Sequence, residues 1–306
     1  MNNFFESLFY HPKWYHWIVS IVLLPISLLC AIGMYLRRKI ATKKRYQIPI
    51  ISVGNLVIGG SGKTPFVVAV AEHFADKKVT IISRGYGRSS SGLLEVSDMG
   101  TVLCSVEESG DEPMLIALSL PKASVIVSEQ RDLAIDLAIE KGAELIVFDD
   151  GFARVEIEKF EILLEPKSLP NLLPLPSGPF REHRRASRYA DLNLKEDRDY
   201  TREVTYENLS DKMVLVTAIA NPVRLDEYLP EGVLAKVYLD NHRYFSKSML
   251  EDILAKNSAD SMLVTQKDWV KMRGFKLPIS LMKLKLQINE QVFPKIEDYI
   301  KDFNES

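Results

Sequence analysis

A glycine-rich segment that ends in lysine and threonine is the first feature of the sequence that could do chemistry. Its members are Gly59, Gly60, Ser61, Gly62, Lys63 and Thr64. Glycine lets backbone N–H groups turn inward around phosphate oxygens. Lys63 would then reach the β- and γ-phosphates of ATP, and Thr64 would bind Mg²⁺. The usual spacing requires a first glycine where this chain has Val57, so a glycine-rich turn that binds nothing is the alternative.

Two adjacent carboxylates follow an apolar run. Residues 145–148 are Leu-Ile-Val-Phe, and Asp149 and Asp150 come directly after them. A buried strand that ends in an acid presents this acid to Mg²⁺ in P-loop proteins. Aspartate also starts turns and caps helices, so the pair alone is a weak signal. Together with the glycine-rich segment it predicts a site for ATP and Mg²⁺.

The elements that position these residues alternate between short β-branched runs and runs of helical period. Strands are predicted at residues 47–53, 79–83, 123–128 and 144–148, and helices at residues 64–75, 113–119 and 131–141. This alternation predicts an α/β fold with a mostly parallel sheet and flanking helices, in which ligands bind beyond the carboxyl ends of the strands. The proline-rich residues 169–188 predict a loop. A second strand-rich region is predicted from Met213, with strands at residues 233–239 and 261–265.

An uncharged apolar run, residues 14–36, lies near the start of the chain. As a helix it would extend roughly 34 Å, enough to cross a bilayer. The basic residues that follow it place the rest of the chain in the cytoplasm and argue against a cleaved signal peptide. Membrane association is therefore expected. A span, a helix in the interface plane and a buried core helix remain open, because Ser20, Pro25, Ser27 and Gly33 weaken the run.

Composition excludes several classes of protein. The chain has 306 residues, 46% of them hydrophobic, and a net charge of -2, which gives no sign of nucleic-acid binding. Cys30 and Cys104 form no CxxC pair, and the five histidines form no HExxH motif. A reducing compartment and the lack of a structural zinc site are expected.

Eight motifs, in order along most of the chain, resemble those of the tetraacyldisaccharide 4'-kinases of lipid A biosynthesis. They are VGNLVIGGSGKTP, SRGYGR, GDEP, VIVSEQRD, FDDGF, LLPLPSGPFRE, IANP and LVTQKD. The missing first glycine is part of that family's pattern. The resemblance implies an ATP-dependent glycolipid kinase. Its acceptor would be the 4'-hydroxyl of an acylated glucosamine disaccharide, a tetraacyldisaccharide 1-phosphate, and no protein partner is predicted.

The resemblance also implies a domain organisation and a location. An N-terminal membrane-associated helix with its basic flank would occupy residues 1–45, and a P-loop kinase core residues 46–205. A smaller C-terminal α/β domain, residues 206–306, would close the active-site cleft. The enzyme would work on membrane lipids at the cytoplasmic face of the inner membrane.

Roles for five further residues follow from the same resemblance. Asp111 of GDEP matches the catalytic base and Glu112 its neighbour, and His242 matches the histidine that pairs with this base. Tyr86 matches a tyrosine near the nucleotide or the sugar, and Arg131 an active-site arginine. Read without the family, GDEP predicts a helix N-terminus with Asp111 as its cap and Pro113 at the first helical position. His242 read alone is an ordinary surface or core histidine.

Three departures from the family pattern leave alternatives open. Ala153 and Arg154 stand where the family commonly has Gln-His, Asn241 precedes His242 in place of an aspartate, and Gln266 replaces a glutamate. An alignment on Asp240 would put Asn241 in the place of the histidine. These departures motivate one competing function, a catalytically reduced nucleotide-binding homologue, and a membrane-associated P-loop NTPase (a switch or motor) is the other. A basic cluster, Arg181, His183, Arg184, Arg185 and Arg188, is either a solvated face or a contact for anionic headgroups.

Overall fold

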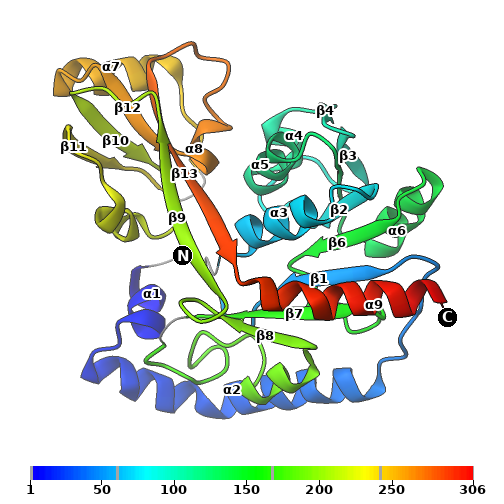
Figure 1. Cartoon of the computed structure of the whole chain (residues 1–306). Helices are drawn as coiled ribbons and strands as arrows, with labels where there is room; N and C mark the ends of the chain where they lie inside the picture. The colour runs from blue at the N-terminus through cyan, green and yellow to red at the C-terminus, as the bar shows by residue number, and fades with distance from the viewer. Residues whose placement is uncertain (1–2, 60–61, 167–168, 241–242, 306) are drawn as a thin grey trace. The chain divides into compact units, whose positions relative to one another are not determined.

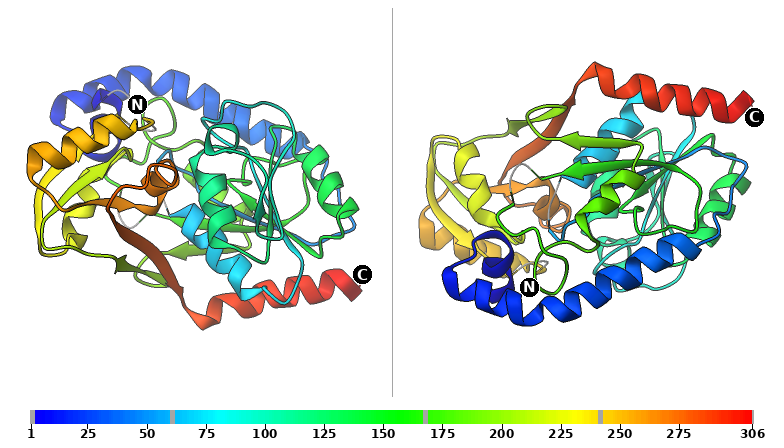
Figure 2. Two further views of the ribbon diagram at one scale, coloured as in Figure 1. Left: turned by 90° about the horizontal axis from the view of Figure 1, so that it is seen from above. Right: turned by 90° about the horizontal axis from the view of Figure 1, so that it is seen from below.

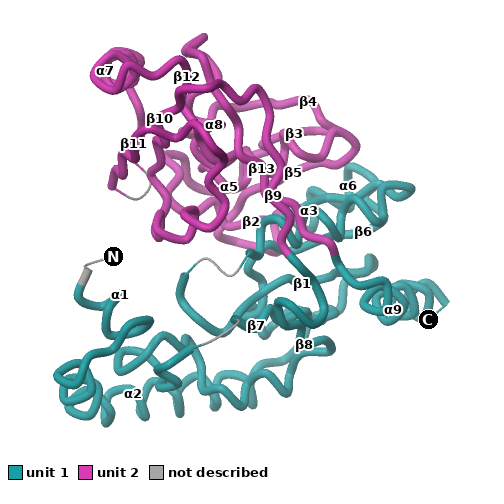
Figure 3. Tube along the Cα trace, turned by 60° about the vertical axis from the view of Figure 1, so that its left-hand side comes forward, with its two compact units in different colours: residues 1–82, 135–201, 288–306 teal, residues 83–134, 202–287 magenta. Residues whose placement is uncertain are grey.

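A computed structural model describes residues 3–59, 62–166, 169–240 and 243–305. These residues group into two compact units, shown in different colours in Figure 3. The first unit comprises residues 1–82, 135–201 and 288–306, and the second residues 83–134 and 202–287. Each unit is thus built from stretches that are distant in the sequence. The three predicted domains, 1–45, 46–205 and 206–306, stay a prediction.

The first unit contains a parallel sheet. Its strands lie in the order β2-β6-β1-β7-β8, with bounds Val79–Ser83, Leu145–Asp149, Ile50–Gly54, Phe160–Glu165 and Leu192–Lys195. Ile50 pairs with Ile146, and Ile51 pairs with both Val147 and Phe160. All five residues of each of the strands β1, β2 and β6 are buried. This continuous burial is typical of parallel strands covered on both faces.

Helices α3 (Lys63–His73), α6 (Arg131–Glu140) and α9 (Phe293–Glu305) flank this sheet (Figure 1). Helix α3 buries Phe66, Val67 and Val70 on one side, at the spacing of a helix turn. The predicted α/β class with a mostly parallel sheet is therefore confirmed. The four predicted strands and three predicted helices are present with ends shifted by a few residues. Strands β7 and β8 were not predicted.

Helix α1 (Asn3–Tyr10) and helix α2 (Trp14–Ile40) precede the sheet. Figures 1 and 2 show α2 as one continuous helix at the edge of the first unit. By length and composition α2 could cross a membrane. Only His16, Ser20 and Ser27 are buried along it, whereas its outer side exposes large apolar residues. These include Trp14, Trp17, Ile18, Ile21, Val22, Ile26, Leu28, Leu29, Ile32, Leu36 and Ile40.

The second unit has two parts. Residues 83–134 supply β3 (Leu94–Asp98), which pairs antiparallel with β4 (Thr101–Val102) and with β5 (Ser124–Val127), and helices α4 (Val106–Ser109) and α5 (Asp111–Ser119). Residues 202–287 supply most of a second sheet with the order β11-β10-β12-β13-β9. Its strands are Val233–Tyr238, Met213–Thr217, Ser261–Thr265, Ile279–Ile288 and Tyr200–Glu207. Helices α7 (Lys247–Asn257) and α8 (Gln266–Trp269) accompany it.

The described residues also form three short 3₁₀ helices. They are η1 (Arg184–Tyr189), η2 (Pro222–Tyr228) and η3 (Glu290–Val292). The second sheet packs its own apolar core around Val216, Leu250 and Met262, which are fully buried. The predicted strands from Met213, at 233–239 and at 261–265, are confirmed. The long strands β9 and β13 were not predicted.

Candidate active site

The glycine-rich segment connects β1 to α3, which is the setting that a phosphate loop requires. Gly62 has φ 79° and forms the N-cap of α3, and Gly59 has φ 111°. Both angles lie in a region that favours glycine. Gly60 and Ser61 lie outside the described residues. Lys63 and Thr64 are the first two residues of an 11-residue helix, whose positive N-terminal end attracts phosphate.

The acidic pair lies beside this segment. Asp149 is the last residue of β6 and is 4% exposed, and Asp150 follows it with φ 59°. The backbone N–H of Asp150 donates to the carbonyl of Val53 at 2.9 Å. The two neighbouring parallel strands β1 and β6 therefore bring the loop and the carboxylates to the same sheet edge, as the sequence predicted.

Cations converge on Asp150. The Lys63 amine lies 3.7 Å from Asp150 Oδ1 and 3.1 Å from Asn55 Oδ1. Arg181, from the basic cluster, lies 2.8 Å from Asp150 Oδ2. The first unit thus brings together the phosphate-loop lysine, one metal-binding candidate and an arginine. The sequence identified Arg181 only as part of a basic cluster, because its partner Asp150 is 31 residues away in the chain.

The donors available here fit Mg²⁺. Asp149, Asp150 and Thr64 offer carboxylate and hydroxyl oxygens, which are the ligands that Mg²⁺ prefers. Among the described residues, no three His, Cys, Asp or Glu side chains come close enough to hold a metal ion. A Mg²⁺ ion bound here would therefore take its remaining ligands from water and from nucleotide phosphates, as is usual for this ion.

Asp111, in the second unit, does not cap its helix. The N-cap of α5 is Gly110, with no side-chain cap hydrogen bond, and Asp111 is the first helical residue. Its side chain is 5% exposed, and its Oδ2 lies 3.5 Å from the amine of Lys271. The predicted cap, with Pro113 at the first helical position, is wrong. The buried amine of Lys271 faces the carboxylate instead, and no property of GDEP itself indicates this partner.

Lys271 lies between two carboxylates and is fully buried. Its amine is 3.4 Å from Asp268 Oδ1 and also donates to the carbonyl of Arg243 at 3.3 Å. Asp268 is fully buried too, and it accepts hydrogen bonds from the hydroxyls of Thr217 (2.6 Å) and Thr265 (2.8 Å). The Thr217 bond joins the end of β10, just before the IANP motif, to the LVTQKD motif, a link that the sequence could not show. Sequence reasoning missed Lys271, because a single lysine carries no motif.

The neighbourhood of position 242 belongs to the same unit as Asp111. Burial, followed by the negative charges of Asp111 and Glu107, raises the pKa of the Tyr244 phenol. Tyr244 therefore lies within electrostatic reach of Asp111. His242 and Asn241 themselves lie outside the described residues, so the pairing of His242 with Asp111 stays a prediction.

Arg88 ties the SRGYGR motif to the VIVSEQRD motif. Its side chain is 2% exposed, and it pairs with Glu129 at 2.6 Å and donates to the carbonyl of Gly92 at 2.5 Å. The hydrogen bond from Arg88 is the main cause that lowers the pKa of Glu129. Tyr86 lies between two glycines of positive φ and is 72% exposed.

Arg131 and Glu112 have well-defined partners in the second unit. Arg131 is 4% exposed, and its guanidinium donates to the carbonyls of Ser83, at 3.0 Å, and of Ser128. It thus holds together the segments that follow β2 and β5. Glu112 pairs with Lys267 of the LVTQKD motif at 3.0 Å, and both side chains are partly exposed.

The structure shows the surroundings of two of the departures from the family pattern. Gln266 Oε1 accepts a hydrogen bond from the backbone N–H of Leu284 at 3.1 Å. A glutamate would offer the same acceptor, so this change keeps the contact. Arg154 lies 3.7 Å from Glu156 at the surface, and Ala153 is exposed.

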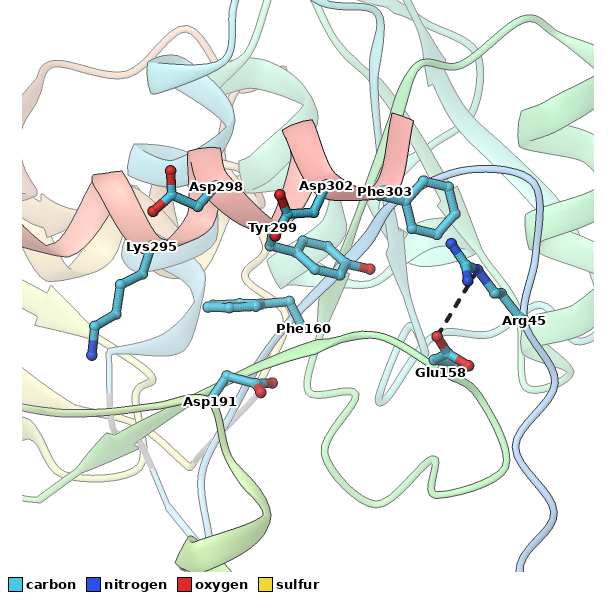
Figure 4. A pocket seen from close by; sticks show the side chains of 9 residues that line it. All are labelled: Arg45, Glu158, Phe160, Asp191, Lys295, Asp298, Tyr299, Asp302 and Phe303. Carbon is cyan, nitrogen blue, oxygen red and sulfur yellow. Dashed lines mark ion pairs between the residues drawn. The ribbon is translucent and has the colours of Figure 1, made fainter. Parts of the chain in front are cut away.

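A separate groove of about 520 Å³ runs along α9 (Figure 4). Arg45 and Glu158 approach each other across it at 4.0 Å. Tyr299 projects from α9, and its hydroxyl makes hydrogen bonds of 3.3 Å with the backbone N–H and carbonyl of Ile50. None of the described residues lining this groove is a predicted site residue, and the glycine-rich segment is not among them.

Comparisons with known proteins agree with this geometry. A family model described as "Tetraacyldisaccharide-1-P 4'-kinase" matches residues 19–302. A tetraacyldisaccharide 4'-kinase from Helicobacter acinonychis is 45% identical over 299 residues, which cover 97% of this chain and 95% of that protein. The same-named protein of Aliarcobacter butzleri is 41% identical over 307 residues, with 97% of each chain covered.

A solved structure shows the same fold. LpxK from Aquifex aeolicus, crystallised in complex with ATP, is 28% identical and has a TM-score of 0.79. The match covers 93% of this chain and 99% of that one. Since the family model spans most of the chain and the named relatives match nearly end to end, the chain belongs to the tetraacyldisaccharide 4'-kinase family.

Proposed function

We propose that this protein transfers the γ-phosphoryl group of ATP to the 4'-hydroxyl of a tetraacyldisaccharide 1-phosphate, a step of lipid A biosynthesis. Family membership and the ATP complex of the Aquifex aeolicus relative support this assignment. The single observation that carries it is the meeting of Lys63 and Asp150 at the carboxyl ends of β1 and β6, at the start of α3.

The first unit binds the nucleotide. The backbone N–H groups of Gly59, Gly60, Ser61 and Gly62 would surround the phosphates, and Lys63 would neutralise the β- and γ-phosphates. Asp149, Asp150 and Thr64 would hold Mg²⁺, which supplies positive charge to the phosphate oxygens. Arg181 stands on the other side of Asp150 and limits the rotation of its carboxylate.

The second unit handles the acceptor. Asp111 accepts the proton that leaves the 4'-hydroxyl as the oxygen–phosphorus bond forms, and His242 orients this carboxylate. Lys271 places its buried amine 3.5 Å from Asp111 Oδ2 and so pairs this buried carboxylate with a cation. Glu112, Tyr86 and Arg131 complete the surroundings of the base, with Tyr86 exposed toward a ligand.

Helix α2 holds the protein at the cytoplasmic face of the inner membrane, and we propose that it lies in the interface plane. Its buried serines are bonded to Ser177: Ser20 donates to the Ser177 carbonyl at 2.8 Å, and Ser27 donates to the Ser177 hydroxyl at 2.7 Å. A spanning helix would pull this polar loop into hydrocarbon, where its backbone groups would lack partners. The exposed apolar side of α2 suits the boundary between headgroups and acyl chains.

The test is phosphoryl transfer with and without the acceptor. We expect slow ATP turnover alone and fast transfer to a detergent-dispersed acylated disaccharide 1-phosphate. Lys63→Ala should abolish transfer while circular dichroism stays unchanged, and Lys77→Ala, at a surface lysine outside the loop, should stay near wild type. Near-normal kcat in a folded Lys63→Ala variant would contradict the phosphate loop. Fast turnover that ignores the acceptor would favour the NTPase switch or motor.

A further inference from the structure

The side chain of Arg38 is buried, whereas that of the preceding residue, Arg37, is not. Arg38 lies in the last turn of α2, and its side chain is 8% exposed, against 45% for Arg37. A basic residue at the end of a membrane-facing helix ordinarily points its charge to water or to lipid headgroups. A buried guanidinium requires partners inside the protein, because an uncompensated charge there is costly.

The partners of Arg38 occupy several sides of its guanidinium. Nε lies 2.5 Å from Glu182 Oε2 and Nη2 lies 2.8 Å from Glu182 Oε1, which is a two-point fork. Nη2 also donates to the carbonyl of Phe152 at 3.1 Å. The guanidinium carbon lies 4.2 Å from the centre of the Phe152 ring and 5.3 Å from that of Tyr189. Lysine could not reproduce this planar, forked arrangement.

Both hydrogen-bonding partners adjoin the candidate metal site. Glu182 follows Arg181, whose guanidinium lies 2.8 Å from Asp150 and whose backbone N–H donates to the carbonyl of Leu56 at 2.8 Å. Phe152 is two residues after Asp150 in the chain. A Cβ added to Gly54 would come within 2.7 Å of the Phe152 Cβ, so Phe152 is pressed against the end of β1.

We propose that Arg38 is a positioning residue for phosphoryl transfer. One guanidinium holds the two chain segments that determine where Asp150 and Arg181 lie: the turn after β6 through Phe152, and the segment after the proline-rich loop through Glu182. Helix α2 is thereby part of the support of the metal site as well as a membrane anchor. This inference rests on the proposed role of Asp150 in binding Mg²⁺.

The test compares matched charge-removing variants of the full-length protein. Arg38→Met and Arg37→Met each remove one cation from the same helix turn, so the change in net charge is the same in both variants. Arg37 is the control because its partner, Glu156, is at 3.4 Å and the two side chains are 45% and 42% exposed. Arg38→Lys keeps the charge and removes the fork. The measurements are kcat, KM for ATP, the Mg²⁺ concentration for half-maximal rate, thermal melting and pelleting with anionic phospholipid vesicles.

We expect Arg38→Met to lower kcat by about 10²-fold in protein that remains folded, since small misplacements of catalytic groups cost this much. Arg38→Lys should require more Mg²⁺ for half-maximal rate. In an Asp150→Asn background, Arg38→Lys should add little further loss, because residues that act as one unit are not additive. Arg37→Met should match wild type in rate, and both variants should still pellet with vesicles, because the exposed apolar side of α2 is unchanged.

Three results would overturn the proposal. They are full activity and a normal Mg²⁺ requirement in Arg38→Lys, equal kinetic losses in Arg37→Met, or losses that multiply fully with Asp150→Asn. If Arg38→Met fails to fold, Arg38→Lys and its Mg²⁺ titration decide the matter alone. Failure of the proposed function is distinguishable, because the wild-type protein would then show no acceptor-dependent transfer in the same assay.

Discussion

Lys271 is the residue on which the carboxylates of the second unit converge. With a fully buried amine within 3.5 Å of both Asp111 and Asp268, it balances charge that would otherwise be stranded in the interior. Buried ion pairs add little net stability compared with apolar packing, yet breaking one is costly. Lys271 is therefore best explained by the need to keep a charged carboxylate at position 111.

Lys271→Met should lower the free energy of unfolding by about 3–5 kcal/mol, because two buried carboxylates lose their shared cation. Urea unfolding followed by fluorescence measures this. Lys267→Met is the matched control, since the Lys267–Glu112 pair is partly exposed and should contribute no more than about 1 kcal/mol. Equal losses in the two variants would show that Lys271 is not paired as the geometry indicates.

Asp111 and His242 should behave as a unit. Changing either to Ala should lower kcat by about 10²–10⁴-fold with little effect on ATP affinity, because neither belongs to the phosphate loop. The double variant should be little worse than the worse single variant. Rapid-quench measurement of phosphoryl transfer decides the matter. A silent His242→Ala, or losses that multiply, would mean that Asp111 works without this histidine and that the alignment on Asp240 is the better one.

Residues within short motifs could be predicted from the sequence, and residues with distant partners could not. The proximity of Lys63 and Asp150 could be predicted, because the carboxyl ends of parallel strands lie at the same edge of a sheet. Asp111 was equally well explained as a helix cap, because its partner Lys271 belongs to another segment of the second unit. Arg38 belongs to no motif, and only its burial identifies it.

At the scale of elements, α2 has a polar side and an apolar side that its hydropathy alone does not reveal. The sequence predicted a helix there but left its environment open, because hydropathy averages over all sides of a helix. Ser20 and Ser27, which looked like weaknesses of a span, form the polar stripe that bonds to Ser177. They are one heptad apart and so face the same way. The apolar residues are left for the opposite side.

Mutations on the two sides of α2 should have different effects, one on stability and the other on vesicle binding. Ser27→Val removes the acceptor of the Ser177 N–H bond (2.9 Å) and the partner of the buried Ser177 hydroxyl, and should cost about 1–3 kcal/mol of stability. Vesicle binding should be unchanged. Leu29→Ser, at a side chain that is 70% exposed, should weaken vesicle binding and leave stability in detergent near wild type. Melting curves and vesicle flotation test this pair. The reverse pattern would contradict a docked, interfacial helix.

At the scale of the whole molecule, the division of the chain was the hardest feature to predict. The predicted domain boundary near residue 205 stays a prediction, and nothing in the sequence indicated that residues 83–134 would group with residues 202–287. Local patterns contain no information on such pairing of distant segments. The grouping matters for mechanism, because Asp111 and the residues on both sides of position 242 belong to one unit. Their interaction then does not require two units to come together.

Deleting residues 1–36 tests how far the N-terminal helices are separable from the catalytic body. The deleted residues include none of the candidate phosphate or metal ligands, so the remaining protein should still bind ATP. It should no longer pellet with vesicles, because the exposed apolar side of α2 is gone.

The structure adds an expectation for the rate. Leu8 and Phe9 of α1 are buried, and the Asn171 side chain donates to the carbonyl of Leu8 at 3.2 Å. Deletion therefore exposes apolar surface and leaves Ser177 and Asn171 without these partners. Arg38 stays in the chain, but the four residues left of α2 are far too few to form a stable helix. We expect kcat toward micellar acceptor to fall even though no membrane is involved. Leu29→Ser in the full-length chain, which weakens membrane binding alone, is the control and should keep its kcat in micelles. A truncated protein that still pelleted fully would refute the anchor, and one with full kcat and unchanged melting would show that α1 and α2 support nothing beyond the membrane contact.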